Sequence, residues 1–237
     1  MKKFKKLIPA FCMLLVSAIM LGSSTFAWFS MNNRVSATDM TVTAKSDQTF
    51  MIIAAGETTA AEAQETNATS VKAQNQNATI LPSAHKDTVA NITTADTVGN
   101  WYYKHSTKPD TFGGAGNETE ETALTTFTGY VLVNTFTVTV AKGANAMKDI
   151  KVETCTISTN GQLAVKALVA TADAAEEFSV ASKEGSTVLQ ASLTDTTVMI
   201  VKVYVYLDGT NTNVFTNNIA NLKSTTVSVT FTGTVVA

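Results

Sequence analysis

The N-terminal segment constrains this chain more than any other stretch. Four basic residues, Lys2, Lys3, Lys5 and Lys6, precede an apolar run at residues 7–21, and small residues follow at 22–25. A basic head, an apolar middle and a small-residue end are the layout of a secretory signal peptide. Thr25 and Ala27 are the small residues that fit a signal peptidase, so we expect cleavage between Ala27 and Trp28, with that peptidase as a transient partner during export.

An uncleaved membrane anchor is the alternative for the same segment. Residues 7–29 number 23, which is long enough for an apolar helix to cross a bilayer with some tilt. Membrane contact is then expected through residues 7–29 alone. Both interpretations place the rest of the chain outside the cytoplasm, secreted, on the cell surface or in a matrix.

Charge and cysteine content narrow the function classes. Removing residues 1–27 leaves 13 Lys+Arg against 19 Asp+Glu, a formal charge of about −6. A mildly acidic exported chain without a basic cluster is a poor candidate for binding nucleic acid. Cys12 leaves with the signal, so Cys155 has no partner for an internal disulfide, and we expect it to be a small buried hydrophobe.

The residue pattern predicts an all-β fold. Thr and Val are abundant and β-branched, and they favour strands over helices. Apolar and polar residues alternate, or apolar residues run together, in eight segments that we interpret as strands: 36–44, 50–55, 127–140, 150–157, 163–169, 187–193, 198–207 and 226–237. Asn160-Gly161 predicts a hairpin between two of them, 172–178 a weak helical turn, and 214–222 a short helix. We expect one antiparallel β-sandwich domain over 28–237, preceded by the apolar N-terminal helix.

A polar insertion is expected at about 57–126. From 57 to 79 the chain holds almost no large apolar residue, so we interpret it as a loop or a loosely attached excursion. Trp101, Tyr102 and Tyr103 form its one aromatic cluster. The cluster is a candidate surface for sugar or protein, although a core anchor is the interpretation we favour.

The sequence offers little for catalysis or metal binding. His85 and His105 lie in the insertion without the paired spacing of a zinc site, and we interpret them as solvated loop residues. Glu176-Glu177 are adjacent, which sends them to different faces of a strand, so we expect solvated charges rather than a glycosidase pair. Calcium at Asp208 lacks a spaced acidic loop. We therefore expect no enzyme, no metal and no cofactor.

Two N-terminal stretches carry a family resemblance. Residues 22–30, Gly-Ser-Ser-Thr-Phe-Ala-Trp-Phe-Ser, and residues 35–42, Val-Ser-Ala-Thr-Asp-Met-Thr-Val, resemble the TasA/camelysin family of Firmicutes. The resemblance covers about 25 residues. It implies cleavage by a dedicated signal peptidase and a jelly-roll sandwich that polymerises into extracellular matrix fibres. Camelysin-like members have been classed as metallopeptidases, but this chain shows no ligand set for that activity.

The same resemblance implies how such a fibre would assemble. The segment freed by cleavage becomes a strand donated to the next subunit, which gives a head-to-tail homopolymer. By position, the donor is 28–42, with anchors at Trp28, Phe29, Met31, Val35, Met40 and Val42. Two alternatives stay open: a membrane-anchored surface or adhesin module that uses the insertion to contact glycan or protein, and a secreted enzyme.

Overall fold

The computed structural model describes residues 35–37, 41–44, 51–56, 58–74, 78–86, 95–106, 119–159, 164–211 and 225–236. These residues belong to one compact unit, Asn33–Ala237. The predicted signal segment, the helix expected at 214–222 and the Asn160-Gly161 turn lie outside the described residues.

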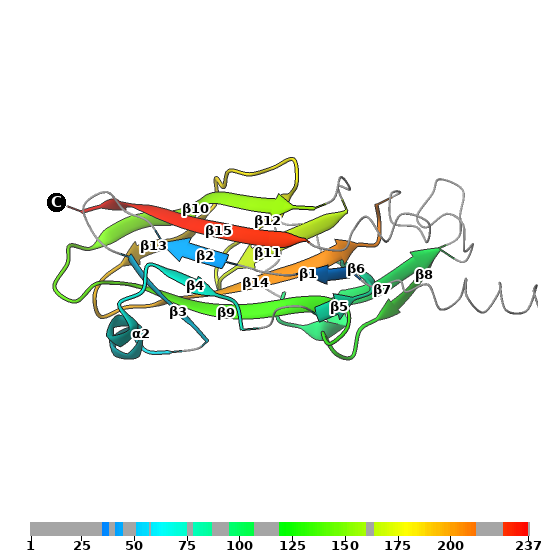
Figure 1. Cartoon of the computed structure of the whole chain (residues 1–237), viewed down its shortest axis with the longest axis horizontal. Helices are drawn as coiled ribbons and strands as arrows, with labels where there is room; N and C mark the ends of the chain where they lie inside the picture. The colour runs from blue at the N-terminus through cyan, green and yellow to red at the C-terminus, as the bar shows by residue number, and fades with distance from the viewer. Residues whose placement is uncertain are drawn as a thin grey trace, which may run out of the picture. The chain divides into compact units, whose positions relative to one another are not determined.

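The described residues are mostly β-strands with little helix, as predicted, and they form two large sheets and one small one (Figure 1). The first large sheet has the order β13 (Val188–Leu193), β10 (Met147–Ser158), β15 (Thr226–Val235), β2 (Thr41–Ala44), β4 (Ser70–Lys72). The second has the order β12 (Ala175–Ser179), β11 (Val165–Ala170), β14 (Met199–Asp208), β6 (Pro82–His85), β7 (Trp101–Ser106), β8 (Thr119–Ala123). Two more strands belong to this sheet: β9 (Val131–Val140) pairs with β14, and β3 (Met51–Ala55) pairs with β9. The small sheet pairs β1 (Val35–Ala37) with β5 (Ala78–Ile80).

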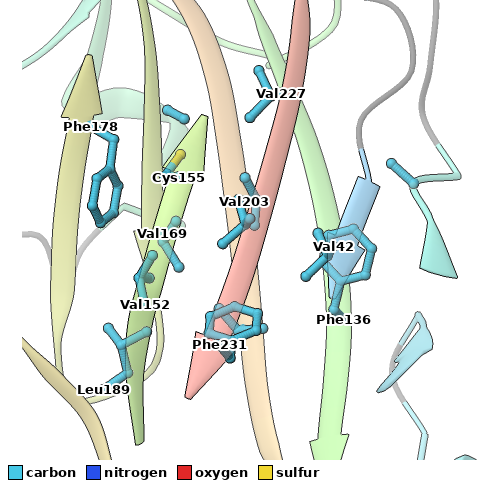
Figure 2. Packing of buried hydrophobic residues seen from close by; sticks show 14 of the residues in the cluster. Val42, Phe136, Val152, Cys155, Val169, Phe178, Leu189, Val203, Val227 and Phe231 are labelled. Carbon is cyan, nitrogen blue, oxygen red and sulfur yellow. The ribbon is translucent and has the colours of Figure 1, made fainter. Parts of the chain in front are cut away.

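The two large sheets share one hydrophobic core. Inward residues alternate along β15 (Val227, Val229, Phe231), and they meet inward residues of β9 and β14, such as Phe136 and Val203 (Figure 2). All five are fully buried. Burying side chains of this size contributes about 1.5–3 kcal/mol each. This shared core accounts for the period-two apolar pattern from which the strands were predicted.

The sheets are mixed, so the expectation of a purely antiparallel fold is wrong. β2 runs parallel to β15 over four paired residues, and β6 runs parallel to the end of β14. Both parallel strands come from the N-terminal part of the chain and reach strands more than 120 positions later. No local sequence pattern encodes pairing over that separation.

The described part of the region 57–126 is not a loop. It contributes α2 (Ala60–Thr66), the 3-10 turn η2 (Val98–Asn100) and β4 to β8. A capping box starts α2, because the Thr59 side chain accepts a bond from the Glu62 backbone N–H while the Glu62 side chain accepts from that of Thr59. Strand pairing brings β4, β6, β7 and β8 into the large sheets and β5 into the small one.

The segment around α2 and the connection between β13 and β14 also cover the outer face of β9. Thr137 donates to the Gly56 carbonyl at 2.9 Å, and Thr139 donates to the Thr197 carbonyl at 2.8 Å. Both threonines are fully buried. Their hydroxyls can lie in the interior because each has a hydrogen-bond acceptor there.

Two local predictions between residues 150 and 180 are also wrong. β10 and β11 belong to different sheets, so they do not form the hairpin that Asn160-Gly161 suggested. Ala175–Ser179 is a strand paired with β11 rather than a helical turn. In both cases cross-strand pairing within a sheet overrides a local turn or helix signal.

We predict that Gly185→Ala destabilises the fold while Gly99→Ala does not. A Cβ at Gly185 would lie 2.6 Å from the Val152 carbonyl oxygen and 2.8 Å from the Val152 Cβ, whereas one at Gly99 meets nothing within 4 Å. Overpacking against backbone costs about 1–3 kcal/mol. Urea unfolding of the two variants checks this, and equal midpoints would contradict the packing described at Gly185.

Candidate functional site

The first candidate site is the position of β2 between β15 and β4. The register pairs Thr41 with Ser228 and Val42 with Val229 on one side, and Val42 with Val71 on the other. Val42 has 0% exposure and belongs to the shared core, as Phe136 does; both are labelled in Figure 2. β2 therefore links β4 to β15 through backbone pairing on both edges, and its Val42 side chain lies in the core.

The strand that fills the place between β15 and β4 is very short. β2 has four residues, and among the described strands β4 is paired only with β2. Removing β2 would expose the ladder edges of β15 and β4 and leave a cavity at Val42. Unpaired strand edges of this kind recruit another strand.

The other predicted donor and cleavage residues are placed only in part. Val35 lies in β1, where it pairs with Ile80 of β5. The remaining ones fall outside the residues that the structure describes: Thr25, Ala27, Trp28, Phe29, Met31 and Met40. Val42 is thus the one predicted anchor whose side chain is described and buried.

The aromatic cluster of the insertion is mainly an anchor of the interior. Trp101 is fully buried on the outer side of the β14 sheet, stacked with Tyr204 at 5.7 Å and edge-on to Tyr206 at 5.0 Å between ring centroids. Its Nε1–H donates to the Ala95 carbonyl at 2.9 Å. Trp101 therefore cannot stack on a sugar in this structure, and the candidate binding surface loses its largest member.

Tyr102 and Tyr103 do not form one surface with Trp101. Strand alternation sends Tyr102 to the other face of β7. Tyr103 packs against the cluster that contains Trp101, and both tyrosines are half-buried. We call this group the second cluster; its buried residues are Ala95, Trp101, Leu124, Val131, Leu168, Ala170, Tyr204 and Tyr206. His85 is not a solvated loop residue, because it lies in β6 with its ring 4.9 Å from Trp101. His105 lies in β7, and its side chain is outside the described ones.

A phenol–carboxylate–lysine group lies beside this cluster. The Tyr204 hydroxyl and Lys202 Nζ both donate to Asp96, the lysine at 2.9 Å. Burial raises the pKa of Asp96, but the two hydrogen bonds and the Lys202 charge outweigh it and hold that pKa below 3.8. Burial and the Asp96 carboxylate raise the pKa of Tyr204, so the phenol stays protonated.

A second group of the same kind joins β11, β12 and β14. Lys166 Nζ lies 2.9 Å from Glu177 Oε1 and 3.0 Å from Asp208 Oδ2. The Tyr206 hydroxyl donates to the other Glu177 oxygen, and Thr210 donates to Asp208 Oδ1 through its N–H at 2.9 Å and its hydroxyl at 2.6 Å. Burial lowers the pKa of Lys166, but the two carboxylates outweigh it and raise that pKa.

These two groups were missed by sequence reasoning. Glu177 was expected to be a solvated charge and Asp208 at most a weak calcium candidate, yet both are ion-paired with Lys166. Glu176 and Glu177 do point to opposite faces, as predicted, since they pair with Val169 and Leu168. One sequence pattern could have indicated both groups: every second residue of 202–208 is polar or aromatic, namely Lys202, Tyr204, Tyr206 and Asp208, within a run that otherwise reads as apolar.

Other candidate chemistry is limited in the described part of the chain. There, no three His, Cys, Asp or Glu side chains are grouped so as to hold a metal ion, and no helix has the length and apolarity to cross a membrane. Cys155 is buried as predicted, and burial raises the pKa of its thiol to about 12. A thiol held protonated in this way is a poor nucleophile.

We predict that Trp101→Ala destabilises the protein by about 3–5 kcal/mol, because it empties the centre of the second cluster. Tyr102→Ala serves as the matched control, since it removes a half-buried ring from the opposite face of the same strand. Chemical denaturation of both variants gives the comparison. A larger loss for Tyr102→Ala would contradict the anchor role of Trp101.

We also predict that Asp96 makes the fold sensitive to acid. Its folded pKa lies below the unfolded value, so its contribution is present above about pH 4 and is lost as the pH falls through the folded pKa. Asp96→Asn keeps an acceptor for Tyr204 and removes the titration. Melting temperatures from neutral pH to about pH 2 should fall less for the variant than for the wild type, and parallel curves would refute the assignment.

Comparison with known proteins adds no relative. No family model matches the chain, and neither a curated protein nor a solved structure matches it significantly.

Proposed function

We propose that this chain is an exported structural subunit of an extracellular or surface fibre that assembles head to tail by exchange of its N-terminal strand. The observation that carries the proposal is the insertion of β2 between β15 and β4, with Val42 buried in the shared core. The partner is a second copy of this chain, and no enzymatic activity is part of the proposal.

The geometry supports exchange for three reasons. β2 has only four residues, and among the described elements only β1 precedes it, so little paired structure has to move with it. Its described contacts are a backbone ladder on each edge and the burial of Val42, and an identical segment of another copy reproduces them. A contact between the N-terminus of one copy and the β15 edge of the next is heterologous and does not close, so it propagates a filament.

Several finer assignments belong to the same proposal. The β-rich unit is a jelly-roll type sandwich of the TasA/camelysin family, preceded by an apolar helix at residues 1–27. A signal peptidase reads Thr25 and Ala27 and cuts before Trp28, which releases residues 28–44 for exchange. The mature chain is secreted to the cell surface or matrix.

The decisive experiment mixes two chains that each carry one added cysteine, Thr41→Cys or Ser228→Cys, both with Cys12→Ser and both keeping Cys155. Thr41 and Ser228 are register partners on β2 and β15, and disulfides span such neighbouring positions. Strand exchange predicts a disulfide-linked heterodimer on non-reducing gels under polymerising conditions. The buried Cys155 should not compete.

The double variant Thr41→Cys/Ser228→Cys supplies the control. If β2 stays in its own chain, this variant forms an internal disulfide and the mixture gives no heterodimer. That result, together with an intact N-terminus and no fibres by electron microscopy, would reject exchange and favour the membrane-anchored surface module.

The resemblance yields one more prediction. Deleting residues 28–35 should leave a soluble monomer, because the donor segment loses its predicted anchors Trp28, Phe29, Met31 and Val35. Sedimentation and negative-stain microscopy of the deleted chain check this. Filaments that persist would refute a donor role for these residues.

A further inference from the structure

We propose that Lys166 and Asp208 condense to an intramolecular amide that covalently links β11 to β14, with Glu177 as the proton acceptor. The three side chains lie together on the outer face of the β14 sheet. Lys166 Nζ is 2.9 Å from Glu177 Oε1 and 3.0 Å from Asp208 Oδ2. This inference is independent of strand exchange.

The register brings the three groups together on one face. Lys166 is the cross-strand partner of Tyr206, Asp208 lies two residues further along β14, and Glu177 lies opposite Leu168 on β12. Positions two apart share a face of a strand. An amine that donates to a carboxylate oxygen at this range is about 3.5–4 Å from the carboxyl carbon. A shift of Lys166 by roughly half an ångström would bring the amine to a near-attack separation of about 3–3.5 Å.

The surroundings of Asp208 resemble those of an acyl acceptor. Its Oδ1 accepts two hydrogen bonds from Thr210, from the N–H at 2.9 Å and from the hydroxyl at 2.6 Å. These donors would stabilise negative charge on Oδ1 as the amine adds to the carbon. The Asp208 side chain is 8% exposed against 20% for Glu177, so Asp208 is the less hydrated carboxylate and the better electrophile once protonated.

The reaction balances without a further reactant. The Lys166 ammonium gives a proton to Glu177, which passes it to Asp208 Oδ2, and the free amine attacks Cγ. A C–N bond forms, the C–Oδ2 bond breaks, and Oδ2 leaves as water with the second amine proton, again carried by Glu177. An ammonium and a carboxylate become one amide and one water, and the desolvation cost of a half-buried ion pair is removed.

The chain contains a matched site that lacks the second carboxylate. Lys202 Nζ lies 2.9 Å from Asp96, and its side chain is 26% exposed against 27% for Lys166. Asp96 is 62% exposed, and the interactions described for this pair include Tyr204 but no second acid. Condensation is therefore expected at Lys166 and not at Lys202.

Mass spectrometry of the purified full chain tests the proposal. We expect the wild type and Lys202→Arg to be lighter than their sequence masses by one water, and a tryptic digest to contain a branched peptide that joins Lys166 to Asp208. Lys166→Arg should have its full sequence mass. Glu177→Gln should form the link about a hundredfold more slowly, which is the usual contribution of a general base.

Two results would overturn the proposal. One is a wild-type chain that keeps its full mass after prolonged incubation at mildly alkaline pH, where more of the amine is free. The other is a water loss confined to the peptide containing Asp208-Gly209 and retained in Lys166→Arg, which would identify a backbone succinimide. Neither result depends on fibre formation, so this proposal and strand exchange fail separately.

Discussion

The burial of both faces of β14 is the constraint on which the rest of the structure depends. Its inward residues, such as Val203, belong to the core between the two large sheets, and its outward Tyr204 and Tyr206 need a cover of their own. Trp101 supplies that cover from a strand that pairs into the same sheet. The described part of the region 57–126 therefore belongs to the fold, because it contributes Ala95, Trp101 and Leu124 to the second hydrophobic cluster and β8 to the edge of the sheet.

The sequence predicted the strands whose apolar residues alternate or run together, because one buried face leaves that pattern directly. It failed for β4 to β8, which are short and lack a clear apolar alternation. β4 and β5 pair with β2 and β1, while β6, β7 and β8 pair in sequence and join the sheet through β14. The sequence predicted β9, but no pattern reveals that Thr137 and Thr139 of this strand are buried through hydrogen bonds to carbonyls. The Asn160-Gly161 signal misled because β10 and β11 belong to different sheets.

For the candidate sites too, sequence predicts what depends on local position and misses what depends on pairing between strands. Val42 was predicted as an anchor by its position in the donor segment that the family resemblance implies, and the structure shows its side chain buried in the shared core. The groups around Lys166 and Asp96 could not be predicted, since each depends on the register between strands rather than on spacing within one. A lysine, a carboxylate and a phenol become one group only after β11, β12 and β14 are aligned.

The placement of β2 has a thermodynamic consequence. If the strand leaves its own sheet and enters that of a neighbour, every pairing that it made before is made again, so the two arrangements differ little in contact energy. The balance between closed monomers and chains of subunits is then set by protein concentration and by any strain in the segment that precedes β2. A protein of this design would stay monomeric when dilute and assemble where it accumulates.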